Sequence, residues 1–315
     1  MTGPEATHHD GDGWVECAQG HRHWGRYGAA GLLLHRHGET GTEVLLQHRV
    51  HWSHHGDTWG VPGGARHHDE SPVETALREA AEEAGLRPES ALVTGRYDDE
   101  HGGWSYSTVV AAAVGVTDAR PTSAETVEMR WWPVSTLPDV PLHPGFAETW
   151  PIVGAAIEPL TIVVDAANVV GSRPDGWWKD RAGAARRLIE DVAAVCSTGI
   201  ADSALPDALQ RPPLQHWWPL VVVVVEGAAR SAAEQAGEDV RGQRVRVVAA
   251  PGSGDDAIVA AVEAVGDSRA SRASRVSRVL VVTADRELRA RCEALGAVPV
   301  GPSWLRGLMD AVRPA

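Results

Sequence analysis

The segment from residue 64 to residue 86 reads GARHHDESPVETALREAAEEAGL, and it decides how the first half of the chain is interpreted. Its second half predicts a helix that presents Glu79, Glu82 and Glu83 on one face, because residues three and four apart are neighbours on a helix. Like charges at this spacing repel, so the cluster requires a compensating cation. Carboxylate oxygens suit hard divalent ions, and we therefore expect a Mg²⁺ site, with Mn²⁺ as the alternative.

The sequence also predicts where this helix begins and ends. Ser71 is expected at the N-cap and Pro72 at the first helical position, with Glu74 three residues after Ser71 completing a capping box. Gly85 is expected to end the helix, because glycine readily adopts the left-handed conformation required there.

A glycine-rich turn, Trp59–Gly64, precedes the helix and permits close approach of the backbone. Glu70 lies between this turn and the helix, where it can pair with Arg78 and hold the loop against the helix. Arg78 would then leave Glu79 well oriented. A solvated acidic helix face is the alternative interpretation, and the turn and the arginine argue against it.

This stretch resembles the box of the Nudix hydrolases at every specified position. The resemblance implies an α/β/α sandwich and hydrolysis of a nucleoside triphosphate or of a nucleoside diphosphate linked to another group, with Mg²⁺ bound. It implies that the three glutamates act as metal ligands or base and that Gly63 offers its carbonyl oxygen. In that family a glutamate beyond the box often assists, and Glu128 is expected here in preference to Glu125. The site residues expected in this half are Gly63, Gly64, Glu70, Arg78, Glu79, Glu82, Glu83, Gly85 and Glu128.

Length and charge indicate two modules. A chain of 315 residues can bury two cores. Residues 1–157 contain 22 acidic and 10 basic residues, whereas residues 158–315 contain 20 and 19. We expect a flexible lead over residues 1–24, a Nudix domain over residues 25–157 and a second domain over residues 158–315. The acidic first half disfavours nonspecific binding of nucleic acid there.

Three cysteines at wide spacing offer no disulfide framework and fit a reducing cytoplasm. No secretory signal is visible, and the longest apolar run, Leu220–Val225, is too short to span a membrane. Cytoplasmic localisation without a membrane partner is therefore expected, and the oligomeric state stays open.

From residue 160 onward, short apolar strands alternate with amphipathic helices, which predicts a parallel sheet with helices on both faces. Strands are expected at 160–164, 220–225, 244–249, 278–283 and 297–300, and helices at about 178–196, 255–265, 285–295 and 303–312.

Acidic residues follow four of these strands, and the carboxyl ends of parallel strands meet at one edge of a sheet. This pattern resembles the NYN branch of the PIN-like ribonucleases, over residues 160–315, with a three-layer α/β/α fold and a mainly parallel sheet. The resemblance implies metal-dependent cleavage of RNA. It implies Asp165, Asp256 and Asp285 as metal ligands, supported by Asn168, Asp255 and Glu226.

The alternative for this half is a PIN-like domain that is catalytically inactive and serves for binding or docking, with its aspartates acting as helix caps. Its near-neutral charge also weakens the case for RNA as a partner.

Two groups of histidines are weaker signals. Cys17, His21 and His23 are metal-ligand types at close spacing, but without a second cysteine pair nearby we expect no structural zinc site. His51, His54 and His55 lie just before the glycine turn, where they are either surface residues or substrate contacts.

Overall fold

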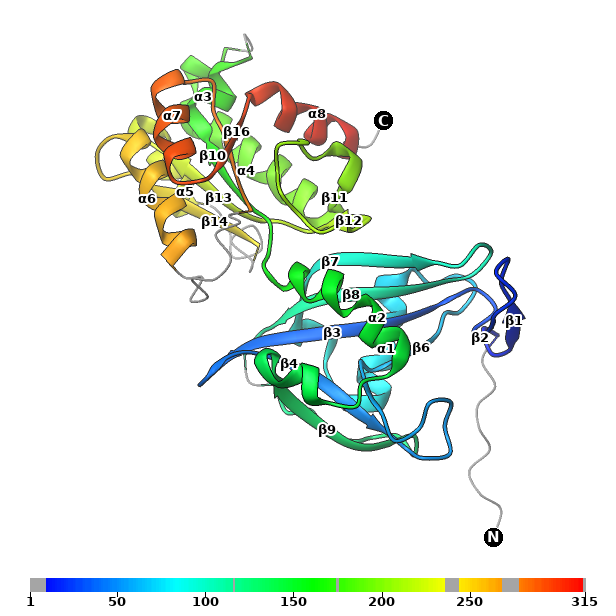
Figure 1. Cartoon of the computed structure of the whole chain (residues 1–315). Coiled ribbons are helices and arrows are strands. Elements are labelled where there is room, and N and C mark those ends of the chain that lie inside the picture. Colours follow the sequence, from blue (N-terminus) through cyan, green and yellow to red (C-terminus); the bar gives the residue numbers. More distant parts are fainter. Residues whose placement is uncertain (1–9, 116, 174–175, 236–243, 268–277, 314–315) are drawn as a thin grey trace. The chain divides into compact units, whose positions relative to one another are not determined.

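The computed structural model describes residues 10–115, 117–173, 176–235, 244–267 and 278–313 (Figure 1). The chain divides into two compact units. The first consists of Met1–Ile157 with Pro212–Gln215, and the second of Glu158–Arg211 with His216–Ala315. Among the described helices, none combines the length and the apolar character needed to cross a membrane.

A mixed sheet forms the centre of the first unit. Its strands follow the order β7-β8-β3-β4-β5, with β6 paired to β3 and β9 paired to β4. β3 is parallel to β8 and antiparallel to β4, and its leucines are fully buried, as expected for a strand with both faces covered. The strands are β3 (Ala29–Gly38), β4 (Gly41–Arg49), β5 (Trp59–Gly60), β6 (Gly63–Ala65), β7 (Ala91–Glu100), β8 (Ser105–Ala113) and β9 (Thr126–Pro133).

Two α-helices belong to this unit, α1 (Pro72–Ala84) and α2 (Pro144–Val153). α1 packs against β3 and β6 through small buried residues, among them Ala76, Ala80 and Ala84. The small side chains bring the helix backbone close to the sheet. Short 3₁₀ helices occupy Pro88–Ser90, Val134–Asp139 and Ala155–Ile157.

The expected flexible lead differs from the structure over its described part. Two antiparallel strands, β1 (Trp14–Glu16) and β2 (Arg22–Trp24), form a hairpin there. Cys17 in its turn is buried with Ala29 and Trp104. The hairpin is therefore anchored by apolar contacts to the rest of the first unit, which a Gly- and His-rich composition did not indicate.

The second unit contains a five-stranded sheet in the order β14-β13-β10-β15-β16. Every neighbouring pair in it is parallel. Valine dominates its strands, and β13 is almost wholly buried, because helices cover both faces. The strands of this sheet are β10 (Thr161–Asp165), β13 (Leu220–Val225), β14 (Val245–Ala249), β15 (Val279–Val282) and β16 (Val298–Val300). Outside this sheet, β11 (Ile200–Ala201) and β12 (His216–Trp217) pair in the antiparallel direction.

The helices of this unit form two groups (Figure 1). α6 and α7 contact each other on one side of the sheet, and α4 and α8 contact each other on the other. Alternate valines of β13 show the division, because Val222 and Val224 belong to the core that α6 and α7 complete. The helices are α3 (Ala166–Gly171), α4 (Arg181–Thr198), α5 (Ser231–Gln235), α6 (Gly254–Asp267), α7 (Arg286–Ala294) and α8 (Pro302–Val312), with 3₁₀ helices at Trp177–Lys179, Asp202–Ala204 and Gly227–Arg230.

Candidate functional site

The ends of α1 are fixed by local hydrogen bonds. The Glu74 backbone N–H donates to the Ser71 hydroxyl at 3.3 Å, and the Ser71 N–H donates to the Glu74 carboxylate at 2.8 Å. Pro72 begins the helix, and Gly85 ends it in the left-handed conformation with φ of 66°. The predicted capping box and stop are confirmed, and they set which residues of the helix face the glycine turn.

Arg78 joins the loop before α1 to the carboxylates on the helix. Its Nε and Nη2 donate to the two oxygens of Glu70 at 2.7 and 3.0 Å. Its Nη1 donates to Glu79 at 2.7 Å and to Glu82 at 3.2 Å. Nη2 also donates to the Ala65 carbonyl at 3.0 Å, which ties β6 to the same group. The predicted Glu70–Arg78 pair is present, and it is bidentate.

The environment of Glu70 favours its ionised form. Burial opposes ionisation, but hydrogen bonds from Arg78, from the His67 backbone N–H and from the Thr75 hydroxyl outweigh it and lower the pKa of Glu70 to about 2. The carboxylate is therefore charged across the physiological range and holds Arg78 in place.

Glu83 is the most enclosed carboxylate of the box, at 7 % exposure. The Gly63 N–H donates to it at 2.8 Å. Burial, reinforced by the charge of Glu79, raises the pKa of Glu83 to about 8 in the absence of a bound cation. A carboxylate held in so apolar a place needs a nearby positive charge to remain ionised.

The glycine turn lies against the same helix face. Gly63 and Gly64 pair with Gly31 and Ala30 of β3, which fixes the turn in the sheet. A Cβ atom on Gly64 would lie 2.6 Å from the carboxyl carbon of Glu79. A side chain at position 64 would therefore displace this carboxylate.

Arg49 joins this cluster and was not predicted from the sequence. It stands at the end of β4, where the pairing with β9 shifts register after His48. Its charge favours the ionised form of Glu83 and lowers the pKa of His143 further, after the larger effect of burial. Its Nε is buried, and no described residue accepts a hydrogen bond from it. A cation at a strand end has no distinctive sequence pattern, so only the packing could reveal it.

Glu128, the additional glutamate expected from the sequence, lies on β9. Its carboxylate pairs with Arg130 at 2.7 Å. Glu125, by contrast, contributes to the raised pKa of Glu83, and its carbonyl accepts a hydrogen bond from the Val50 N–H at 3.1 Å. The register shift at the Arg49 end of β4 brings the segment before β9 beside the cluster and leaves Glu128 farther along the strand.

Histidines border the same region. The side-chain ligand atoms of His54, His55 and His143 lie within 4.8 Å of one another. Burial lowers the pKa of His143 to about 4, and the charge of Arg49 and the two other histidines act in the same direction. His143 is therefore neutral at physiological pH. One of its ring nitrogens can donate a hydrogen bond and the other can accept one.

In the second unit, Asp165 at the end of β10 is the centre of a polar network. It accepts hydrogen bonds from the Asn168 backbone and side chain at 3.0 and 2.9 Å and from the Thr283 hydroxyl at 2.8 Å. Asn168 in turn accepts from the Ala284 N–H at 3.2 Å. Asp285 caps α7 through the Leu288 N–H at 2.9 Å. The ends of β10 and β15 are thus joined, as the strand-end pattern predicts.

The two aspartates at the start of α6 differ in their surroundings. Asp256 is exposed and pairs with Arg291 at 2.7 Å. Asp255 instead faces the strand ends, since burial and then the charges of Asp165 and Asp285 raise its pKa. Adjacent helical residues point about 100° apart, so the packing of α6 decides which one faces inward. Glu226 accepts a hydrogen bond from the Gly254 N–H at 2.9 Å and holds this helix start.

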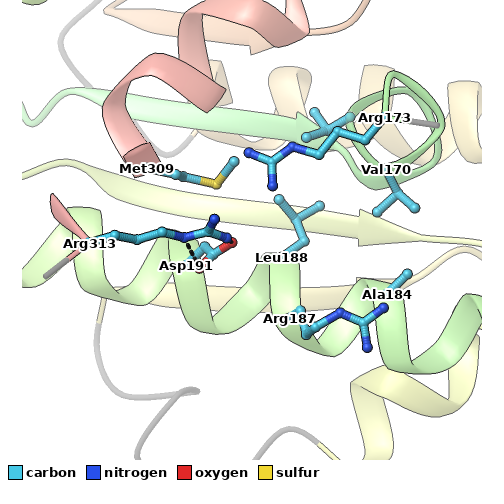
Figure 2. A pocket seen from close by; sticks show the side chains of 9 residues that line it. Val170, Arg173, Ala184, Arg187, Leu188, Asp191, Met309 and Arg313 are labelled. Carbon is cyan, nitrogen blue, oxygen red and sulfur yellow. Dashed lines mark hydrogen bonds and ion pairs between the residues drawn. The ribbon is translucent and has the colours of Figure 1, made fainter. Parts of the chain in front are cut away.

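A pocket in the second unit is lined by residues of α3, α4 and α8 and by Arg173 and Arg313. Figure 2 shows arginine side chains beside an apolar floor, and the Arg313 guanidinium pairs with Asp191 at 2.6 Å. Arg173 pairs with Asp310 at 3.3 Å. These pairs offset much of the positive charge. The lining residues are Val169, Val170, Arg173, Ala184, Arg187, Leu188, Asp191, Met309 and Arg313.

Comparison with known proteins places this site in a family. The NUDIX domain model matches residues 26–152. A Mycobacterium tuberculosis protein named "Putative 8-oxo-dGTP diphosphatase 3" is 50 % identical over 155 residues, which cover 46 % of this chain and 70 % of that protein. A Bifidobacterium longum "Nucleoside triphosphate pyrophosphatase/Nudix hydrolase fusion protein" is 43 % identical over 161 residues, covering 50 % of this chain and 33 % of that protein.

A solved structure is also similar, a Nudix hydrolase from M. smegmatis named RenU. It is 44 % identical, with a TM-score of 0.44, and the match covers 46 % of this chain and 93 % of that one. All of these matches cover about half of the present chain or less. From the domain match and the mycobacterial relative, the chain belongs to the Nudix family of hydrolases, which act on phosphoric anhydride bonds.

Proposed function

We propose that the first unit hydrolyses a nucleoside triphosphate to a nucleoside monophosphate and pyrophosphate, with 8-oxo-dGTP as the first substrate to test. The observation that carries the proposal is the complete box, in which Arg78 orients two carboxylates while Glu83 is buried beside the glycine turn. The name of the mycobacterial relative, at 50 % identity, supports the choice of substrate.

The donor atoms of this site fit Mg²⁺. Glu82, Glu83 and the Gly63 carbonyl supply oxygen ligands only, and hard oxygen ligands are those that Mg²⁺ prefers. The raised pKa of Glu83 shows that the protein alone compensates its charge poorly. When bound there, the ion would neutralise the phosphate charge and lower the pKa of a bound water.

The residues around the ion have separate roles in this proposal. Glu79, oriented by Arg78, takes the proton of the attacking water, which adds to a phosphorus of the anhydride as the bridging P–O bond breaks. Arg49 binds a phosphate of the substrate, because its buried Nε–H is a hydrogen-bond donor without an acceptor among the described residues. The water supplies the oxygen of one product, and pyrophosphate leaves as the other.

Steady-state hydrolysis by the full chain tests this proposal. The substrates are 8-oxo-dGTP, dGTP, ADP-ribose and a dinucleotide polyphosphate, each with Mg²⁺ and with Mn²⁺, and the products are separated by ion exchange. We expect pyrophosphate release from the triphosphates and the highest kcat/KM with 8-oxo-dGTP. Hydrolysis of ADP-ribose alone would refute the substrate class, and no hydrolysis of any compound would refute the enzymatic proposal.

Two variants separate the roles of the glutamates. E83Q is expected to lower kcat/KM on the order of 100-fold or more and to raise the Mg²⁺ concentration needed for half-maximal rate. E79Q is expected to lower kcat while leaving that Mg²⁺ dependence unchanged. An unchanged kcat in E79Q would exclude it as the base, and E125Q is then the variant to measure.

We propose as a second function that the second unit is a PIN-like, metal-dependent ribonuclease. The observation that favours it is the electrostatic interaction of Asp255 with Asp165 and Asp285 near the ends of parallel strands. In this proposal Asp255 takes the place that the sequence analysis gave to Asp256 among the metal ligands. Mg²⁺ or Mn²⁺ held by such carboxylates would activate water for cleavage of a phosphodiester.

Cleavage of single-stranded RNA by the full chain with Mn²⁺ tests the second function. D255N is expected to abolish cleavage and D256N to retain it, because Asp256 is directed to Arg291. An absence of cleavage across varied RNAs, together with no Mn²⁺ binding by calorimetry in the E83Q background, would favour the docking alternative instead.

A further inference from the structure

The turn of the β1–β2 hairpin and the turn between β7 and β8 bring together four metal-ligand side chains. The ligand atoms of Cys17, His21, His23 and His101 all lie within 4.8 Å of one another. Three come from one short segment, whereas His101 comes from a position far along the chain. A cysteine and three histidines match the ligand types and the number of a tetrahedral structural zinc site.

Backbone hydrogen bonds hold the two turns in this arrangement. The Gly20 N–H donates to the Cys17 carbonyl and the Cys17 N–H to the His21 carbonyl, both at 2.9 Å, which closes the hairpin turn. The Ala18 N–H donates to the Gly102 carbonyl at 2.9 Å, which joins this turn to the one that carries His101. The cluster is therefore not the product of loose side chains on a mobile surface.

The histidine rings present unused nitrogens to the cluster. His23 Nε2 and His101 Nδ1 are buried, and neither has a hydrogen-bond partner among the described residues. Burying a polar nitrogen without a partner costs free energy, and a metal ion bound to each of these nitrogens would remove that cost. The His23 ring is also fixed by stacking on Trp104, with ring centroids 4.0 Å apart and an interplanar angle of 11°.

Asp99 sets the orientation of His101. Its carboxylate lies 3.2 Å from His101 Nε2. The proton of a neutral imidazole is therefore expected at Nε2, which leaves the lone pair of Nδ1 directed to the cluster. A carboxylate behind a histidine ligand is the usual arrangement around protein-bound zinc, where it fixes the tautomer and increases ligand basicity.

We propose that Cys17, His21, His23 and His101 bind one Zn²⁺ ion, which clamps the β1–β2 hairpin onto the turn between β7 and β8. All four ligands come from the protein, as in structural rather than catalytic zinc sites. The thiolate and imidazole donors distinguish this site from the oxygen-only carboxylate cluster on α1, so the two sites select different metals.

The geometry needs little change to accept the ion. Zinc bonds of about 2.3 Å to sulfur and 2.0–2.1 Å to nitrogen place tetrahedral ligand atoms roughly 3.3 to 3.6 Å apart. Ligand atoms that already lie within 4.8 Å reach this spacing through small side-chain rotations. His21 is exposed, and its ring has the most freedom to close the site.

This proposal departs from the expectation of no structural zinc site at Cys17, His21 and His23. That expectation rested on the absence of a second cysteine pair nearby in the sequence. The fourth ligand is instead a histidine supplied by a distant turn, and tertiary structure alone brings it into place.

The test uses the full chain, produced without a histidine tag so that no added ligand binds metal. Elemental analysis after purification is expected to find one zinc per chain. Replacement by Co²⁺ is expected to give the visible bands of a tetrahedral ion and a sulfur-to-cobalt charge-transfer band. No zinc in the purified protein and no tetrahedral Co²⁺ spectrum in the folded chain would overturn the proposal.

Variants assign the ligands. H21A keeps the buried residues intact and is expected to fold, but to lose zinc at least 10-fold more readily to a chelator. C17S is expected to lose the charge-transfer band. H37A, which removes an exposed histidine on β3, and E82Q, which alters the carboxylate cluster, are expected to keep zinc. Chelator resistance in H21A equal to that of H37A, with an unchanged Co²⁺ spectrum, would remove His21 from the site and refute the four-ligand model.

Discussion

The Arg78 guanidinium binds both carboxylate oxygens of Glu70, at 2.7 and 3.0 Å, across the loop that enters α1. The remaining nitrogen of the same group contacts Glu79 and Glu82. A glutamate outside the helix therefore controls the orientation of carboxylates on it. This connection makes the loop part of the hydrolytic machinery.

Replacing Glu70 tests this connection. E70Q removes the charge that holds Arg78 and is expected to cost about 1 to 3 kcal/mol of stability and to lower kcat more than it changes KM. Steady-state kinetics and urea unfolding measure the two effects. E89Q is the control, because Glu89 pairs with Arg87 on the surface with both side chains more than half exposed. Equal effects of the two variants would show that Glu70 has no special role.

Adding one methyl group at Gly64 should displace Glu79. The new Cβ would lie 2.6 Å from the Glu79 carboxyl carbon, so the carboxylate must move. A displacement of this size is expected to lower kcat on the order of 100-fold. G252A is the control, since no atom lies within 4 Å of its added Cβ. Retention of full activity in G64A would mean that Glu79 tolerates displacement and does not act on the substrate.

Arg49 is expected to contribute to binding of the triphosphate. R49A should lower kcat/KM by about 10- to 100-fold, the effect of losing one charge-assisted hydrogen bond. The loss should be smaller for a substrate with fewer phosphates. R36A is the matched control, because Arg36 lies on the neighbouring strand and pairs with Glu43 at 2.8 Å. Identical kinetics for R49A and the unmodified chain would exclude phosphate binding by this residue.

His35 should make stability depend on pH. It is buried in β3, and burial lowers its pKa to about 4 from an ordinary value of 6.5. Below pH 6.5 the unfolded chain binds a proton that the folded chain does not, so stability falls as pH decreases toward 4. At pH 5 this proton uptake by the unfolded chain lowers the free energy of unfolding by about 2 kcal/mol relative to neutral pH.

Urea unfolding of the first unit at pH 7.5 and pH 5 measures this change in the free energy of unfolding. H35L is expected to lose less stability between these values than the unmodified chain, by about 2 kcal/mol. H37L changes an exposed histidine on the same strand and should leave the pH dependence as it was. The same dependence in H35L and H37L would show that His35 is not its source.

The local elements of this protein follow from short-range signals. The capping box at Ser71 and the stop at Gly85 predicted both ends of α1. The apolar run of β13 predicted a strand that is buried on both faces. Such features depend on hydrogen bonds and side chains a few residues apart, which a sequence displays directly. Pairing of Glu70 with Arg78 was also predictable, because both lie within one loop and helix.

Other features of the candidate sites depend on packing between distant segments. Asp255 and Asp256 are equivalent in the sequence, and the rotation of α6 against the sheet selects Asp255. Glu125, just before β9, contributes to the raised pKa of Glu83, whereas Glu128 pairs with Arg130. In both cases the deciding contacts are made with segments far along the chain.

The sequence by itself determined the Nudix box, the order of its carboxylates and the helix that carries them, because these depend on spacing along one segment. The tertiary structure decided that Arg49 stands beside Glu83 and that His101 completes a cluster with Cys17. Those residues are far apart along the chain, and only the burial of apolar strand and helix faces in a common core brings them together.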